Sequence, residues 1–163
     1  MEPRPGMALT LEGVPGEFIR NRNIEGDPKK SDRGFATRSF TIRLTPEYVQ
    51  LLEANGFPIG YPQDTTNEPM PYLAVVLFPE AKYRYPASIV VMDTGHTRKQ
   101  LDVSKWREFD ERPIEYVDVE LETYLNKNGA VRVKAPILYF HTKYSILREK
   151  YIDISDPDVE PAP

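Results

Sequence analysis

The fold class of this chain is decided by two alternating runs, Ile114-Glu-Tyr-Val-Asp-Val-Glu-Leu-Glu-Thr-Tyr-Leu125 and Ala130-Val-Arg-Val-Lys-Ala-Pro-Ile-Leu-Tyr-Phe-His141. Apolar and polar residues alternate in both runs with the period of two that is typical of half-buried strands. Between them, Lys127-Asn128-Gly129 fits a three-residue connection in which Gly129 takes the left-handed conformation. The sequence therefore predicts a long antiparallel hairpin.

The alternation also predicts which residues face one another across this hairpin. Taken from the turn without interruption, the register sets Val117 opposite Tyr139 and Val119 opposite Ile137 on the core face. On the other face it sets Glu122 beside Lys134 and Tyr124 beside Arg132, pairs that stabilise neighbouring strands.

Further strands are expected on both sides of one helix. Apolar and β-branched runs predict strands at residues 18–24, 34–44, 72–78 and 87–92, the last two buried on both faces. Thr45-Pro46-Glu47 supplies an N-cap, a first-turn proline and an acid, and Gly56 supplies the end of a helix over 46–55. Trp106 and Phe109 predict a short helical turn near 104–110. The fold class is thus mainly β, an antiparallel barrel or sandwich with one inserted helix.

Composition restricts the kind of protein that this is. The 163 residues suit one domain, with a flexible N-terminal arm over 1–16, a folded domain over 17–152 and a disordered acidic tail over 153–163. The chain has no cysteine and only two histidines, so no disulfide framework, metal site or cofactor is expected. No N-terminal signal and no apolar run of about 20 residues is present, and we expect an intracellular protein without a membrane segment.

Charge is unevenly distributed along the chain. The tail, residues 153–163, has no cation and four acids: Asp153, Asp156, Asp158 and Glu160. Its charge of −4 is the whole net charge of the chain, so the remaining residues are neutral in sum. Residues 20–43 carry seven cations against three acids, a locally basic segment. Such a segment suits a polyanionic partner, although a solvated loop has a similar composition.

One short motif combines cations with aromatic rings. Lys82-Tyr83-Arg84-Tyr85 lies between two predicted strands, where it offers phosphates a charge and bases a flat surface. An ordinary solvated hairpin can carry the same residues, and the motif alone leaves both interpretations open.

Catalytic patterns are weak, and the sequence predicts a protein that is not an enzyme. Asp93-Thr94-Gly95 resembles the aspartic protease triplet but occurs once, so we interpret it as a turn. Asp118, Glu120 and Glu122 alternate on one strand face and would suit a divalent cation, yet Arg132 and Lys134 already suit them as ion-pair partners. No nucleophile elbow and no phosphate-binding glycine loop is present.

The order of landmarks resembles phage-encoded single-stranded DNA-binding proteins with an OB-type barrel. The resemblance covers roughly residues 17–142 and rests on short stretches: Phe18-Ile-Arg-Asn-Arg-Asn23, Gly34-Phe35, Arg38-Ser-Phe40, the helix ending at Gly56, Tyr72-Leu-Ala-Val75, Pro86-Ala-Ser-Ile-Val90, Leu101-Asp102, Phe109-Asp110, Ile114-Glu-Tyr-Val-Asp118 and the hairpin past Gly129.

This resemblance implies sequence-nonspecific binding of single-stranded DNA in phage replication or recombination, in the host cell cytoplasm, by a monomer or small homo-oligomer. The residue inventory is compatible with it. The candidate phosphate contacts are Arg20, Arg22, Lys29, Lys30, Arg33, Arg38, Lys82 and Arg84, and the candidate stacking rings are Phe35, Tyr83, Tyr85 and Trp106.

Three alternatives stay open at this level. The acidic tail either recruits replication or recombination proteins or is a solubilising disordered end. The whole chain could instead be a β-sandwich structural or protein-interaction module, such as a small virion component, without nucleic-acid binding. A metal-dependent nuclease using Asp118, Glu120 and Glu122 is the third.

Overall fold

The computed structural model describes residues 2–30, 37–62, 70–80 and 86–143, which form one mixed sheet of eight strands and two short α-helices. The strands are β1 (Ala8–Pro15), β2 (Ile19–Asn23), β3 (Ser39–Arg43), β4 (Tyr72–Val76), β5 (Ser88–Met92), β6 (Arg98–Leu101), β7 (Ile114–Leu125) and β8 (Val131–Thr142). The helices are α1 (Pro46–Ala54) and α2 (Arg107–Glu111), with single 3₁₀ turns η1 (Gly16–Phe18), η2 (Pro28–Lys30) and η4 (Val103–Lys105). The predicted mainly β fold with one inserted helix is confirmed.

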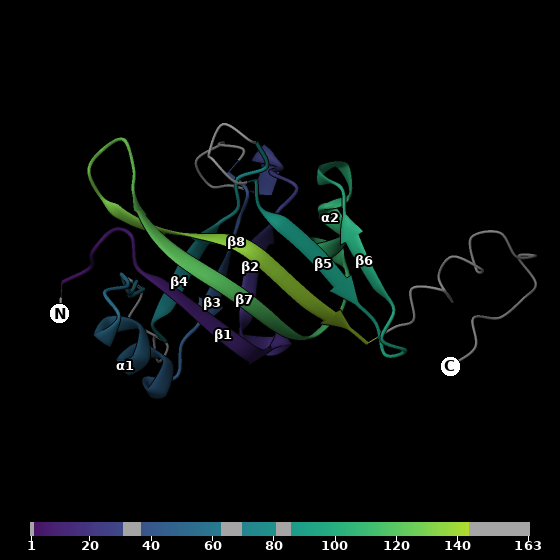
Figure 1. Ribbon diagram of the computed structural model, residues 1–163, viewed down its shortest axis with the longest axis horizontal. Helices are drawn as coiled ribbons and strands as arrows, with labels where there is room; N and C mark the ends of the chain where they lie inside the picture. Colours follow the sequence, from purple (N-terminus) through teal and green to yellow (C-terminus); the bar gives the residue numbers. More distant parts are fainter. Residues whose placement is uncertain (1, 31–36, 63–69, 81–85, 144–163) are drawn as a thin grey trace, which may run out of the picture.

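The main path of the sheet runs β1-β7-β8-β4-β3-β2 and curves back toward its own start. Its two end strands, β1 and β2, are consecutive in the chain and are joined only by Gly16–Phe18. Figure 1 shows β1, β7 and β8 in front of the fainter β2, β3 and β4. If β1 and β2 are taken as one bent strand, the path is a five-stranded Greek-key barrel that is left partly open, the OB-like architecture.

The chain turns a corner at Gly16–Phe18, where β1 passes into β2 beside the start of β7. This close approach to β7 requires a glycine. A Cβ atom on Gly16 would lie 1.9 Å from the carbonyl oxygen of Ile114, the first residue of β7. No larger residue fits without a shift of the backbone, so the sequence closes the corner with the one residue that has no side chain.

Strand β8 has two different parallel neighbours along one edge. Near its start, Lys134 pairs with Val76 of β4, and from Ile137 onward it pairs with β5. Pro136 lies between the two segments and has no N–H group to donate to either neighbour. The sheet therefore branches at Pro136, and the β5–β6 hairpin leaves the main path there, as Figure 1 shows at the right. The predicted all-antiparallel sheet is wrong for these two pairs.

The hairpin register changes at the same place. Glu122 pairs with Lys134 and Tyr124 with Arg132, as predicted. A shift between Glu120 and Glu122 then moves the pairs from Glu120 to Tyr116 by one, so that Val119 faces Leu138 rather than Ile137 and Val117 faces Phe140 rather than Tyr139. Leu138 and Phe140 are buried in consequence, while Ile137 and Tyr139 turn to the outer face.

The core fills the interior of the curved sheet with aliphatic side chains and a stack of rings. Phe109 of α2 lies 5.3 Å from Phe40 of β3 and 5.2 Å from Phe140 of β8, centroid to centroid, in tilted and edge-to-face arrangements. Trp106, between η4 and α2, is also fully enclosed. The predicted helical turn near 104–110 is thus present as η4 and α2, and its two rings belong to the core.

The expected flexible arm over residues 1–16 is wrong for the part that forms β1. Its residues pair with β7 from Ala8 to Pro15, and Leu11 and Val14 lie in the core. The prolines and glycines that suggested a loose segment lie at the strand's ends and at a bulge at Gly13, whose φ is +65°. The predicted tail, residues 153–163, lies outside the described residues.

Helix α1 begins and ends as its local sequence predicts. The Thr45 side chain accepts a hydrogen bond from the backbone N of Tyr48 at 3.3 Å, and Pro46 occupies the first turn. Gly56 follows the helix with a φ of +76°. Leu52 is buried and joins the hydrophobic core, so the helix, which lies between β3 and β4 in the chain, is anchored to the body of the protein. No helix in the described part of the chain is long and apolar enough to cross a membrane.

Candidate nucleic-acid interface

The outer face of β2, β3 and β4 is open and polar. Inward positions such as Phe40, Ile42 and Leu73 are buried, whereas Arg20 and Ala74 are exposed on the outer side. Strand β4 was predicted to be buried on both faces, and its exposed Ala74 shows that this is wrong. The short side chains of Thr41 and Ala74, which are paired in the ladder, form a low floor in the middle of the face.

Longer side chains surround this floor. Arg20 of β2 is the ladder partner of Thr41. Arg43, two residues after Thr41 in β3, is the ladder partner of Tyr72 in β4. Together with Asn21 and Pro62, these residues line a shallow groove of about 690 Å³. Among the described residues that line it, two are arginines and none is an aspartate or glutamate. The groove therefore combines positive charge, neutral hydrogen-bonding groups and a flat ring.

A bulge in β2 positions the polar groups of the groove. The pairing of β2 with β3 is interrupted between Arg20 and Asn23, and Asn21 has a φ of +53°, which asparagine tolerates better than most residues. Its Nδ2 donates to Thr41 Oγ1 at 3.1 Å, and Thr41 Oγ1 donates to the backbone O of Arg20 at 3.1 Å. This chain of hydrogen bonds fixes Asn21, Thr41 and the backbone that carries Arg20.

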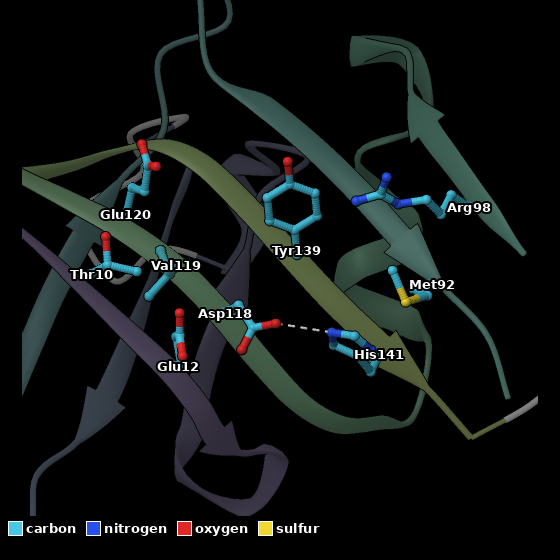
Figure 2. Close-up of a pocket in the computed structure, with 9 residues that line it drawn as sticks. All are labelled: Thr10, Glu12, Met92, Arg98, Asp118, Val119, Glu120, Tyr139 and His141. Atoms are coloured by element: carbon cyan, nitrogen blue, oxygen red, sulfur yellow. Dashed lines mark hydrogen bonds and ion pairs between the residues drawn. The ribbon is translucent and has the colours of Figure 1, made fainter. Parts of the chain in front are cut away.

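A second, smaller pocket lies on the other half of the sheet and has the opposite character. It encloses about 290 Å³ and is lined by Thr10, Glu12, Met92, Arg98, Asp118, Val119, Glu120, Tyr139 and His141. Figure 2 shows its three carboxylates, Glu12 from β1 and Asp118 and Glu120 from β7. Arg98 lies over the Tyr139 ring at 5.7 Å. Three acids against one arginine make this pocket unsuitable for phosphates.

The carboxylates of this second pocket do not form a metal site. Asp118 Oδ2 lies 3.0 Å from His141 Nε2, and its Oδ1 accepts a hydrogen bond from the backbone N of Gly13 at 2.8 Å. Glu122 is the ladder partner of Lys134. Within the described ranges no group of three His, Cys, Asp or Glu side chains is arranged to hold a metal ion. The geometry thus gives the nuclease alternative no support.

Two of the predicted phosphate contacts lie where a strand of nucleic acid could reach them. Arg20 is exposed on the groove, and Lys29 is exposed in η2, in the connection between β2 and β3. Lys30 ends the same turn. Arg33, Phe35, Lys82, Tyr83, Arg84 and Tyr85 lie outside the described residues.

The other described candidates have structural contacts instead. Arg22 Nη1 donates to the backbone oxygens of Phe109 and Arg112, at 2.5 and 2.8 Å. Burial lowers the pKa of the Arg22 guanidinium, and the carboxylate of Asp110 acts in the opposite direction. The predicted role of Arg22 in binding phosphates therefore finds no support in its geometry.

Arg38 and Trp106 form a pair with each other. Arg38 Nη1 donates to the backbone O of Ile24 at 3.0 Å, and its guanidinium lies 5.5 Å from the Trp106 ring. Trp106 is 1% exposed, so neither face of its ring is open to a base in this structure. We leave both residues out of the interface.

Sequence reasoning did not name five of the six groove residues among its candidate contacts: Asn21, Thr41, Arg43, Pro62 and Tyr72. Arg43 belongs to the polar strand face that the alternation predicts, and its position on the strand was a usable signal. Tyr72 gave no such signal, because it begins an apolar run. Asn21 depends on the bulge, which residue spacing alone does not predict.

No protein-family model and no curated protein matches this chain. Among solved structures, the chain is similar to the single-stranded DNA-binding protein from bacteriophage Enc34 in a C-terminally truncated form, with a TM-score of 0.45 and 9% sequence identity. The match covers 85% of this chain and 87% of that one. At this identity and TM-score the similarity is too low to support an argument about function.

Proposed function

We propose that this protein binds single-stranded nucleic acid, single-stranded DNA in the first place, along the outer face of β2, β3 and β4. The observation that carries the proposal is the acid-free groove, where Arg20 and Arg43 flank the hydrogen-bonded pair Asn21 and Thr41. Binding there is a non-enzymatic function: the arginines neutralise phosphates and release counterions, and no bond is broken.

The position of the groove in the fold supports this proposal. With β1 and β2 taken as one bent strand, β3 and β4 are the second and third strands of the partly open barrel. In OB-like folds the face of these two strands and the loop before the second strand are the usual oligonucleotide surface. Lys29 lies in that loop, exposed. Arg20, Arg43 and Lys29 thus extend over one continuous part of the fold.

The remaining predicted contacts extend the same proposal. Lys30, Arg33, Lys82 and Arg84 would add phosphate contacts, and Phe35, Tyr83 and Tyr85 would add stacking. These residues belong to the β2–β3 and β4–β5 connections. Both connections meet the sheet at the same end, because Ser39 at the start of β3 pairs with Val76 at the end of β4. The setting we propose, phage DNA replication or recombination in the host cytoplasm with partners recruited by the acidic tail, rests on the resemblance of the sequence landmarks.

The test is fluorescence anisotropy of a labelled oligo-dT at increasing salt concentration. We expect binding by the intact chain that weakens steeply with salt. Arg20→Ala/Arg43→Ala should reduce the affinity about a hundredfold or more at low salt, because each of the two charge-assisted contacts contributes about 1.5–3 kcal/mol. The slope of log K against log salt should fall by about 1.4, at about 0.7 for each lost phosphate contact on a single strand.

A matched control distinguishes the loss of the groove arginines from a general loss of positive charge. Lys105 and Lys143 are exposed and lie outside the groove, so Lys105→Ala/Lys143→Ala removes the same charge elsewhere. We expect nearly unchanged affinity for this control. Equal losses for the two double variants, or no binding by the intact chain at low salt, would contradict the proposal and leave the protein-interaction module as the better hypothesis.

A further inference from the structure

Tyr72 and Gly60 form an unusually close pair at one end of the groove. The backbone N of Gly60 donates to Tyr72 O at 2.8 Å, and the backbone N of Tyr72 donates to Gly60 O at 2.9 Å. These two bonds form an isolated antiparallel bridge that sets the two residues directly opposite each other. In such a pair both side chains project from the same face of the sheet.

The ring of Tyr72 occupies the space that a side chain at position 60 would fill. A Cβ atom on Gly60 would lie 2.5 Å from Tyr72 Cζ, 2.6 Å from Cε2 and 2.9 Å from Cε1. Contacts this short do not occur between real side chains, so only glycine allows the ring to lie where it does. The backbone of Gly60 therefore supports the hydroxyl end of the ring and fixes its position.

The same ring reaches the groove. Tyr72 lines it together with Pro62, and its ladder partner is Arg43. A fixed ring beside an arginine suits a nucleotide, because the base can stack on the ring while the guanidinium meets the adjacent phosphate. The ring is already held in place, so little conformational entropy is lost when a base binds.

We propose that Tyr72, supported by Gly60, is a base-stacking position of the groove and makes the protein distinguish a strand with bases from a bare sugar-phosphate backbone. This inference rests on the proposed function and goes beyond it, because phosphate contacts alone do not detect bases. Stacking of one base on one ring corresponds to roughly a five- to 150-fold gain in affinity.

The experiment compares two labelled probes of equal length and charge, oligo-dT and an oligonucleotide of abasic sites. The intact chain should bind oligo-dT more tightly than the abasic strand. Tyr72→Leu should weaken binding of oligo-dT at least fivefold and leave binding of the abasic strand nearly unchanged, whereas Tyr72→Phe should retain the preference. Gly60→Ala, which displaces the ring, should reproduce the selective loss seen for Tyr72→Leu.

Tyr61 supplies the matched control. It is 62% exposed and its hydroxyl lies 3.4 Å from Glu53 Oε1 on α1, so Tyr61→Leu removes a neighbouring ring outside the groove lining. We expect both probes to bind this variant as they bind the intact chain. Circular dichroism of each variant checks that the fold is retained.

The outcomes separate the inference from the function on which it rests. If the intact chain binds both probes equally, or Tyr72→Leu weakens both equally, Tyr72 is not a stacking position, while nucleic-acid binding stands. If the intact chain binds neither probe, the proposed function fails and the inference fails with it.

Discussion

The guanidinium of Arg22 lies 5.8 Å from the centre of the Phe109 ring and donates from Nη1 to the backbone oxygen of the same residue. This contact joins β2 to α2, and Asp110 strengthens the junction by accepting hydrogen bonds from the backbone N of Ile24 and Glu25. Two segments almost ninety positions apart are thus held in part by Arg22, which sequence reasoning assigned to phosphate binding.

Arg22→Ala should destabilise the protein and not change its intrinsic affinity for DNA. The substitution leaves the carbonyl oxygens of Phe109 and Arg112 without the Arg22 donor, at a cost of about 1–3 kcal/mol. Thermal unfolding by circular dichroism measures the loss. Arg20→Ala, two positions away and exposed, is expected to do the reverse, with weaker DNA binding at an unchanged melting temperature. A binding defect in Arg22→Ala that is larger than its unfolded fraction explains would contradict this assignment.

Gly16→Ala should also lower the melting temperature. The new methyl group would meet the carbonyl oxygen of Ile114, and relief of such overpacking typically costs about 1–3 kcal/mol. Gly95→Ala is the control, because a Cβ there meets only Asp93 Oδ1 at an ordinary 3.5 Å and the residue has no positive φ. Equal stability of the two variants would show that the corner between β1 and β7 is looser than the structure indicates.

The N-terminal strand should contribute to stability as a part of the core. Leu11 is 3% exposed, and Leu11→Ala should cost about 2–5 kcal/mol in the free energy of unfolding. Glu12→Ala, the next residue and exposed, should cost less than about 0.5 kcal/mol. Chemical denaturation of both variants provides the comparison, and a flexible arm would make them indistinguishable.

The acidic pocket should lie outside the path of the nucleic acid. Glu12→Gln/Glu120→Gln removes two of its three carboxylate charges without altering side-chain size. We expect the affinity for oligo-dT to stay within about twofold at moderate salt, where charges more than about 10 Å away are screened. A gain of tenfold or more would indicate that DNA passes over β1 and β7 as well.

Local signals in the sequence predicted local structure well. The cap at Thr45, the first-turn proline and Gly56 belong to one short segment, and helix α1 begins and ends where they indicate. The turn of the long hairpin is equally local, and Gly129 has the positive φ, +80°, that its position requires. Asp93 accepts hydrogen bonds from the backbone N of Gly95 and Thr97, which confirms the turn expected there.

Features that depend on distant partners could not be predicted in this way. Strand β1 has few large residues and is stabilised by β7, which lies far along the chain, so its prolines and glycines suggested an arm. The register shift beside Pro136 coincides with the place where β8 changes its parallel neighbour from β4 to β5, two strands that lie far from it in the sequence. Cations present the same difficulty: Arg20, Arg22 and Arg38 look alike in the sequence, yet only Arg20 is exposed.

The corner at Gly16–Phe18 also has a consequence for how the chain acquires its fold. The strand before it is completed only by β7, and the hydrogen bond from Gly13 N to Asp118 joins residues 105 positions apart. At synthesis rates of about 5–20 residues per second, the first strand leaves the ribosome on the order of ten seconds before its partner exists. During synthesis β1 therefore stays unpaired for several seconds, with its backbone hydrogen-bonding groups and the apolar side chains Leu11 and Val14 exposed. We expect folding to be slow and to depend on chaperones.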